Sequence, residues 1–180
     1  MAKLNELNSP PTGGGGGKQL LLIRHAKSDW GDFSLPDFDR PLNERGKRDA
    51  PVMAQRLLDK KITIDAFIAS PAKRAKKTAG FFAETYKRDK DEIVFHKELY
   101  GAAELIFYDV IAATKNKFDS IAIFSHNPGI TDFANLLTNT RIDNIPTCGI
   151  FAVKIDCNNW TDFKTANKEF LFFDYPKNGD

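Results

Sequence analysis

The sequence predicts a single α/β domain in which helices cover both faces of a mostly parallel β-sheet. Short apolar runs alternate along the chain with longer amphipathic segments, a pattern that strand–helix–strand units produce. Several of these runs are apolar throughout, as expected of strands that are buried on both faces. A chain of 180 residues suffices for one domain with a substantial core, and it contains no internal repeat.

The start of the chain differs from the rest in composition. A Pro-Pro pair and a run of five glycines cannot bury apolar surface, so residues 1–18 are expected to form a flexible leader. The glycine run is not a phosphate-binding P-loop, because it precedes the first strand and its lysine is not followed by Ser or Thr. The predicted domain therefore covers residues 19–180.

Four elements are predicted in the first half of this domain. They are a strand at 19–23, a helix at 43–60, a strand at 66–69 and a helix at 72–86. Asn43 can cap the first helix, and Pro51 inside it is expected to kink the helix or to delay its start. Pro71 favours the start of the second helix, since proline is common at that position.

The second half of the domain continues the alternation of strands and helices. Its predicted elements are a helix at 104–114, a strand at 121–124, a helix at 128–137 and two late strands within 149–155 and 163–173. The two late strands are expected to be antiparallel, at an edge of the sheet. The alternation before them places the connecting helices on both faces of the sheet.

Side chains suited to phosphate chemistry follow three of the predicted strands. The first strand ends at Arg24 and His25. Arg74 lies shortly after the second strand, and His126 follows the third. Because ligands bind outside the carboxyl ends of parallel strands, and these ends share one edge of the sheet, we expect the four side chains to converge.

These residue types suit a phosphoryl group. An arginine guanidinium matches phosphate oxygens and stays charged at any working pH. A histidine can attack phosphorus through a ring nitrogen and later leave, because its pKa lies near neutrality. We therefore favour an anion-binding catalytic site over purely structural histidines at these strand ends. His96, in an irregular polar stretch, is expected to be structural or on the surface.

Bulk properties exclude several classes of function. A formal net charge of +2 gives no sign of a nucleic-acid partner, and no stretch reaches the roughly 18 apolar residues that a membrane span requires. Two cysteines do not make a disulfide framework, which fits a reducing, cytoplasmic setting. Metal-ligand spacings and dinucleotide-binding motifs are lacking, so we expect no metal and no cofactor.

Basic residues are clustered locally despite the balanced total. The clusters lie in residues 45–48 and 73–77. Such clusters are usually solvated helix faces, and the alternative is a field that attracts an anionic substrate.

Four motifs resemble those of the histidine phosphatase superfamily, also described as the phosphoglycerate mutase-like fold. They are Arg24-His25-Ala26, Leu42-Asn43-Glu44-Arg45-Gly46, the segment from Ser70 to Ala79 with Arg74 and Thr78, and Ser125-His126-Asn127-Pro128-Gly129. They occur in the family's order over residues 19–151. The resemblance implies a three-layer α/β/α fold and a metal-independent phosphatase with a phosphohistidine intermediate on His25. It also implies that Arg24, Arg74 and His126 hold the phosphoryl oxygens.

Within this superfamily the chain resembles the SixA branch of small phosphohistidine phosphatases. The similarity lies in residues 24–28, in Asp39-Arg40-Pro41-Leu42 and in the motif around His126. The short interval between Arg74 and His126 leaves no room for a large cap domain, so we expect an open groove. Such a groove suits a phosphorylated partner protein or a small phosphoester.

Three further residues are candidates for substrate binding, namely Arg40, Asn43 and Ser28. Arg40 could instead pair with Asp37 or Asp39, and Asn43 could serve only as a helix cap.

The resemblance fails at the proton donor. Mutase-like members carry a Leu-x-Glu element, whereas Leu99-Tyr100-Gly101 has no acid here, which leaves Glu98 and Glu104 as candidates or as plain surface carboxylates. An imidazole, with a pKa of about 6.5, leaves with little help, whereas an alkoxide needs a proton. The sequence therefore favours phosphohistidine as substrate. A broad phosphomonoesterase and a phosphate-binding module without turnover are the alternatives.

Overall fold

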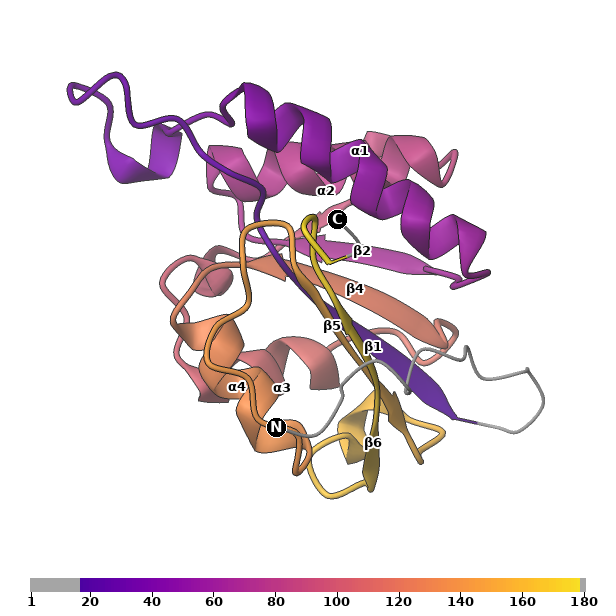
Figure 1. Cartoon of the computed structure of the whole chain (residues 1–180). Helices are drawn as coiled ribbons and strands as arrows, with labels where there is room; N and C mark the ends of the chain where they lie inside the picture. Colours follow the sequence, from indigo (N-terminus) through magenta and orange to yellow (C-terminus); the bar gives the residue numbers. More distant parts are fainter. Residues whose placement is uncertain (1–16, 179–180) are drawn as a thin grey trace.

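The computed structural model describes residues 17–178. Its strands are β1 (Lys18–Arg24), β2 (Ala66–Ala69), β3 (Val94–Phe95), β4 (Ser120–Ser125), β5 (Ile150–Ile155) and β6 (Lys168–Asp174). Its helices are α1 (Glu44–Asp59), α2 (Lys73–Thr85), α3 (Glu104–Ala112) and α4 (Gly129–Leu137). Short 3₁₀ turns lie at Asp37–Asp39, Lys90–Glu92, Lys97–Leu99 and Trp160–Asp162. The predicted three-layer α/β/α architecture is confirmed, with α1 and α2 on one face of the sheet and α3 and α4 on the other (Figure 1).

The six strands form one sheet in the order β3-β2-β4-β1-β5-β6. The first four of these are parallel to one another, and β5 is antiparallel to both of its neighbours. The late strands are therefore antiparallel as predicted, but only β6 forms an edge, because β5 is inserted between β6 and β1. The other edge is β3, which the sequence did not predict because only two residues, both exposed, form it.

Strand β1 shows why the apolar runs lack polar alternation. Leu21 and Ile23 belong to the core on the side of α1 and α2. Leu20 and Leu22 belong to the core on the side of α3 and α4. Successive side chains of a strand point to opposite faces, so a strand covered on both sides is apolar at every position. This double burial fixes the position of the residues that follow the strand.

Helix α1 begins at Glu44, directly after its cap. The Asn43 side chain accepts a hydrogen bond from the Gly46 main-chain nitrogen at 2.9 Å, which satisfies a free donor of the first turn. The expected delay of the helix start by Pro51 is wrong, because the cap and a stripe of buried apolar side chains hold the helix on both sides of the proline.

Within residues 17–178, no helix is long and apolar enough to cross a membrane.

The domain begins one residue earlier than predicted. Lys18, expected in the leader, opens β1 and is only 3% exposed. Its ammonium group donates to the Phe118 carbonyl at 2.9 Å and to the Asp119 carboxylate at 2.8 Å. A lysine is stable in a buried position when all its donors find partners, and these partners lie far away in the sequence. Residues 1–16 of the predicted leader lie outside the described residues.

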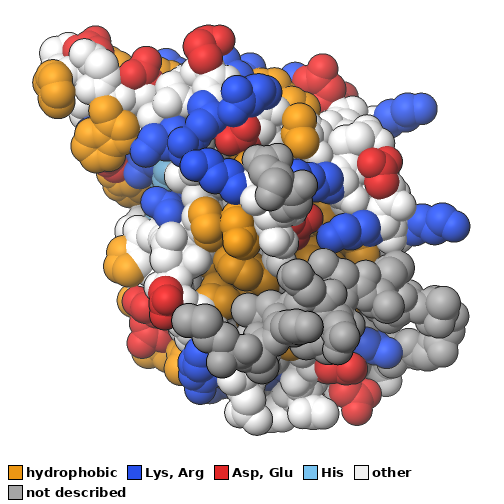
Figure 2. Space-filling model, in the orientation of Figure 1, with side chains coloured by type: hydrophobic (Ala, Val, Ile, Leu, Met, Phe, Trp, Pro, Cys, Tyr) orange, Lys and Arg blue, Asp and Glu red, His pale blue; other side chains and the backbone are white. Residues whose placement is uncertain are grey.

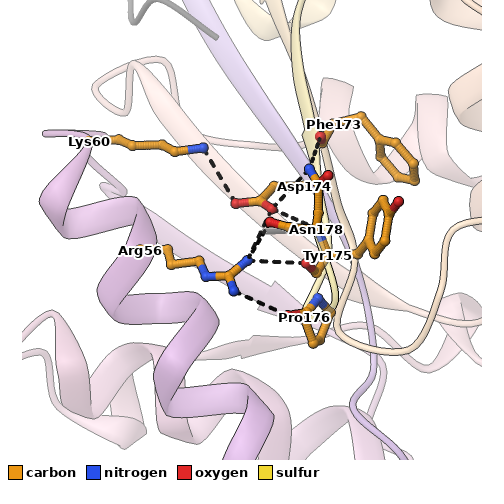
Figure 3. A network of polar contacts seen from close by, with 7 residues as sticks. All are labelled: Arg56, Lys60, Phe173, Asp174, Tyr175, Pro176 and Asn178. Carbon is orange, nitrogen blue, oxygen red and sulfur yellow. Dashed lines mark hydrogen bonds and ion pairs between the residues drawn. The ribbon is translucent and has the colours of Figure 1, made fainter. Parts of the chain in front are cut away.

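The segment after β6 is attached to α1 by a polar network (Figure 3). The Asp174 carboxylate accepts a hydrogen bond from Arg56 at 3.3 Å and pairs with Lys60 at 3.4 Å. The Arg56 guanidinium also donates to the carbonyl groups of Tyr175 and Pro176. This network ties the end of β6, which lies level with the carboxyl end of β1, to the helical layer.

Candidate active site

The residues predicted to converge do lie together at one edge of the sheet. Arg24 closes β1, opposite Ser125 of β4, so the residues that follow the two strands are neighbours. The imidazole ring centroids of His25 and His126 are 5.1 Å apart, and Arg74, from the first turn of α2, contacts His25. In the space-filling view, histidine surface is visible among Lys and Arg side chains just below the projecting segment (Figure 2).

His25 presents its Nε2 atom to the arginines. Its Nδ1 atom lies 2.8 Å from the Ala26 carbonyl oxygen. A carbonyl oxygen can only accept, so Nδ1 carries the proton and Nε2 keeps a lone pair. The Arg74 Nε–H group donates to this lone pair at 3.2 Å. The nitrogen that can attack phosphorus is thus held where a guanidinium can also bind the phosphoryl oxygens.

Both histidines of the site are neutral at pH 7. Burial lowers the pKa of His25 to about 3, although the hydrogen bond to the Ala26 carbonyl acts in the opposite direction. Burial, and then the charge of Arg74, lowers the pKa of His126 to about 4. A neutral imidazole has the lone pair that nucleophilic attack requires, so His25 needs no separate base to activate it.

His126 keeps one ring nitrogen available. Its Nε2 atom lies 2.8 Å from the Ser70 hydroxyl oxygen, which also accepts a hydrogen bond from the Ala72 main-chain nitrogen. The hydroxyl proton can therefore be donated to Nε2, which leaves the ring proton on Nδ1. Among residues 17–178, the buried Nδ1 atom has no hydrogen-bond partner. It is suited to donate to an oxygen of a bound anion.

Thr78, in the motif that contains Arg74, positions the two halves of the site relative to each other. Its hydroxyl group donates to the Arg74 carbonyl at 2.7 Å and accepts from the Ala26 main-chain nitrogen at 2.9 Å. The first contact lies within α2 and the second reaches the segment after β1. One threonine one helical turn after the arginine therefore fixes Arg74 next to His25.

Asn127 has a similar positioning role on the side of Arg24. The Arg24 guanidinium donates to the Ile145 carbonyl at 2.9 Å and to the Asn144 side chain at 3.3 Å. The Asn127 side chain donates to the same two groups. The motif after β4 thus orders the loop that orients Arg24. Burial and the charge of Arg74 lower the pKa of Arg24.

Two motif glycines permit close approaches of the backbone. A Cβ atom at Gly46 would lie 2.2 Å from the Lys27 carbonyl oxygen, and one at Gly129 would lie 1.8 Å from the Ala102 carbonyl oxygen. Neither distance is possible for a real side chain. Gly46 therefore allows α1 to pack closely against the residues just after His25. Gly129 allows the start of α4 to pack closely against the main chain at Ala102.

Asp37 is the site residue that sequence analysis missed, since it was considered only as a partner of Arg40. It belongs to the segment between β1 and α1, which projects from the body of the domain (Figure 1). Its carboxylate accepts hydrogen bonds from Arg74 Nη2 at 2.9 Å and from the Tyr100 hydroxyl at 2.8 Å. Its partial burial acts to raise its pKa, but the bonds from Tyr100 and Arg74 outweigh this effect and hold the pKa below its ordinary value.

A cavity of about 140 Å³ lies over these residues. Its lining includes His25, Arg24, Arg74 and Asp37, together with the buried Ser28. The substrate-binding candidate Ser28 is therefore at the site. The Asp37 carboxylate occupies part of the Arg74 fork that the family resemblance assigns to a phosphoryl group.

The other two binding candidates are placed differently. The Arg40 guanidinium stacks 3.5 Å from the centroid of the Trp30 ring and lies 3.7 Å from the Asp37 carboxylate. The suggested pairing of Arg40 with Asp37 is thus present, beside the cavity. The Asn43 side chain is used as the cap of α1. The role that the structure shows for Asn43 is therefore that of a helix cap.

The two candidate proton donors do not line this cavity. The Glu98 carboxylate is 64% exposed and lies 3.9 Å from His96 Nδ1. Glu104 lies in the first turn of α3 and is partly exposed. The carboxylate nearest the candidate nucleophile in the described cavity is that of Asp37 instead. No local pattern marks Asp37, because its partners Arg74 and Tyr100 are remote in the sequence.

We expect the Asp37→Asn variant to bind inorganic phosphate more tightly. The amide keeps the shape of the carboxylate but removes a negative charge that competes for Arg74. For a half-exposed ion pair of roughly 0.5–1 kcal/mol, the inhibition constant of phosphate should fall about two- to five-fold. Asp39→Asn, in the same turn, is the matched control and should leave the constant unchanged. An unchanged constant for Asp37→Asn would show that the carboxylate does not compete.

The fold and the residues at its carboxyl edge together define a phosphatase of the histidine type. The sequence model described as the histidine phosphatase superfamily (branch 1) matches residues 20–100. Over these residues the chain matches the superfamily that its motifs predict, and its fold is SixA-like. Together these matches support phosphatase activity.

The chain is also similar to individual proteins and solved structures. An uncharacterized chloroplast protein of Arabidopsis thaliana is 27% identical over 153 residues, which cover 81% of this chain and 70% of that protein. A SixA structure from Agrobacterium tumefaciens matches with a TM-score of 0.72 and 24% identity over 88% of this chain and 99% of its own. The protein histidine phosphatase SixA complexed with tungstate matches with a TM-score of 0.76 and 21% identity over 90% and 99%. At these identities the structural matches show the fold.

Proposed function

We propose that this protein removes the phosphoryl group from phosphohistidine on a partner protein, through a transient phosphohistidine on its own His25. The observation that carries the proposal is the geometry of His25, whose Nδ1 atom faces the Ala26 carbonyl and whose Nε2 atom faces Arg74. This atom is unprotonated and buried, and the Arg74 guanidinium lies 3.2 Å away. Nucleophile and anion-binding group are therefore side by side before substrate arrives.

The reaction has two steps. In the first, His25 Nε2 forms a bond to phosphorus while the bond between phosphorus and the substrate imidazole breaks. The substrate ring, protonated on its other nitrogen, keeps the electron pair and leaves as neutral imidazole. In the second, water attacks phosphorus and gives a proton to the solvent, the electron pair of the breaking bond returns to Nε2, and inorganic phosphate is released. Arg24, Arg74 and His126 hold the phosphoryl oxygens in both steps and stabilise the charge of the in-line transition state.

The protonation state of Asp37 supports phosphohistidine over an alkyl phosphoester. Hydrogen bonds from Tyr100 and Arg74 hold its pKa low, so the free protein carries a carboxylate there and no proton to donate. An alkoxide leaving group needs such a proton, whereas an imidazole does not. The similar SixA structure that contains tungstate, a tetrahedral oxyanion, is compatible with a phosphoryl site in this fold.

A broad phosphomonoesterase is the second candidate. Asp37 is the observation that favours it, because this carboxylate lines the same cavity as His25. A phosphoryl dianion bound beside Asp37 would raise its pKa and could convert it into a proton donor. In that case esters would be hydrolysed as well as phosphoramidates.

Single-turnover phosphate release in the presence of EDTA separates the two candidates. The substrates are a histidine-phosphorylated protein, p-nitrophenyl phosphate and glycerol phosphate. We expect fast release from phosphohistidine, slower release from the aryl ester and the slowest release from the alkyl ester, in the order of leaving-group pKa. Equal or faster release from glycerol phosphate would reject phosphohistidine specificity and favour the esterase. No release from any substrate would favour a phosphate-binding module.

A further inference from the structure

A second and larger cavity lies beside α2, with a volume of about 600 Å³. We call it the lysine groove, after the four lysines in its lining, which are Lys73, Lys76, Lys77 and Lys90. The turn Lys90–Glu92 and the edge strand β3 complete its wall. None of the residues assigned to phosphoryl transfer lines it.

The charge of the lysine groove is not balanced within the described part of the chain. Lys90 pairs with Glu84 at 2.9 Å. The three lysines of α2 form no ion pair among residues 17–178, and the one carboxylate in the lining is Asp91. Like charges three or four positions apart on a helix destabilise it slightly. The cluster therefore does not serve the stability of α2, and within the described residues the ammonium groups of its three α2 lysines are free of ion pairs that an external anion would have to displace.

Two phenyl rings line the groove beneath the lysines. The Lys76 ammonium lies 5.4 Å from the centroid of the Phe95 ring, and the Lys77 ammonium lies 5.1 Å from that of Phe81. Phe95 remains 39% exposed. A small inorganic anion would make no use of these rings. A polypeptide segment that carries both carboxylates and apolar side chains would contact the ammonium groups and the rings together.

The edge strand β3 adds a feature suited to polypeptide. It pairs with β2 on one side and is the last strand of the sheet on the other. Its outer main-chain groups can therefore pair with an extended segment, as in β-strand addition. This favours a protein over a single-stranded nucleic acid, which also binds basic and aromatic surfaces.

The lysine groove begins next to the catalytic cavity. Lys73 directly precedes Arg74, whose guanidinium contacts His25. From Lys73 to Gly80 the groove follows α2 for about 10 Å, at 1.5 Å per residue. An extended chain covers that distance in about three residues. A segment with its phosphohistidine at His25 can thus place residues a few positions away over the lysines.

We propose that the lysine groove binds an acidic segment of the partner protein whose phosphohistidine reaches His25. The enzyme then selects phosphohistidines that have carboxylates several residues away. This inference rests on the proposed function for the identity of the reacting group. The groove supplies attraction over a distance and fixes the register of the bound segment.

Two phosphohistidine peptides of equal length test the proposal. One carries four Glu residues, two on each side of the phosphohistidine and each three to six positions away from it. The other carries Gln at the same four positions. At low ionic strength we expect kcat/KM to be about tenfold higher for the acidic peptide, and the difference should shrink in high salt. In the double variant Lys76→Glu/Lys77→Glu the preference should disappear, while turnover of phosphoramidate stays at the wild-type level.

The matched control is the double variant Lys115→Glu/Lys117→Glu. It makes the same charge change in the loop before β4, at the opposite end of the strands, and Lys117 also lies over a phenyl ring, at 5.0 Å. It should keep the preference for the acidic peptide. Equal kcat/KM for the two peptides in the wild type, or equal loss in both double variants, would overturn the proposal.

Binding of a fluorescent, unphosphorylated acidic peptide separates this inference from the proposed function. If the peptide binds in a manner that depends on Lys76 and Lys77 but phosphohistidine is not hydrolysed, the proposed function is rejected and the binding role of the groove is kept. If phosphohistidine is hydrolysed equally from both peptides, the binding role of the groove is rejected and the proposed function is kept. Tighter binding of a single-stranded oligonucleotide than of the acidic peptide would reject a protein as the occupant.

Discussion

His25→Ala should abolish turnover of every phosphate substrate and leave the fold intact. The substitution removes the one nitrogen that is both unprotonated and in contact with Arg74. His126 does not offer the same arrangement, because its Nε2 atom accepts from the Ser70 hydroxyl group and not from an arginine that can also bind the phosphoryl group. A nucleophile that forms a covalent intermediate typically contributes several powers of ten, so we expect kcat to fall by at least about 10³-fold.

The measurement for His25→Ala combines rates with trapping of the intermediate. Rapid acid-free quenching with radiolabelled substrate should recover a phosphorylated wild-type chain and no phosphorylated variant. His96→Ala is the matched control, because His96 contacts Glu98 and lies outside the catalytic cavity. It should keep full activity. A phosphorylated His25→Ala chain with wild-type kcat would refute the assignment of the nucleophile.

Arg74→Lys should cost nearly as much, although it preserves the charge. Arg74 donates through Nε to His25 and through Nη2 to Asp37, so its fork spans nucleophile and anion site. A lysine has one ammonium group and cannot make both contacts with the same geometry. Because such donors act on charge that develops in the transition state, we expect kcat/KM to fall by about 10²- to 10³-fold.

The matched control for Arg74→Lys is the same substitution at an exposed arginine outside the site. Arg48→Lys makes the same change at a side chain that is 70% exposed on α1, and kcat/KM should stay within two-fold of wild type, about 0.4 kcal/mol. Thermal unfolding of both variants checks that the fold is retained. A wild-type kcat/KM in Arg74→Lys would mean that charge alone, and not the planar fork, holds the phosphoryl group.

Asp37 links the resting site to substrate binding. In the free protein its carboxylate satisfies Arg74, and Tyr100 donates to the same carboxylate. A buried guanidinium without a partner is costly, so this arrangement keeps the empty site stable. We propose that a phosphoryl group, with more negative charge, replaces the carboxylate at the fork. Exchange of one anion for another avoids the cost of exposing an unpaired charge.

Local sequence patterns determined a large part of this protein. The apolar runs predicted β1, β2 and β4, because a strand that is buried on both faces is apolar at every position and is therefore recognisable in the sequence. The residues after these strands predicted where Arg24, His25, Arg74 and His126 would meet, since parallel strands share one carboxyl edge. The four motifs predicted the superfamily. Whether these four residues catalyse the reaction is what the substitutions above test.

Contacts between remote residues were decided by the tertiary structure alone. Lys18 can be buried because its ammonium group meets partners that lie 98 to 101 residues away in the sequence. Strand β3 forms because its two residues pair with β2. Asp37 enters the site through Arg74 and Tyr100, which are 37 and 63 residues distant. Periodicity and capping signals report only on neighbours within a few positions. A side chain whose role depends on a distant partner leaves no such signal. The carboxylate at the site therefore emerges only when the chain is folded, and so does the wall of Lys90 and Phe95 that makes a groove of the lysine cluster in residues 73–77.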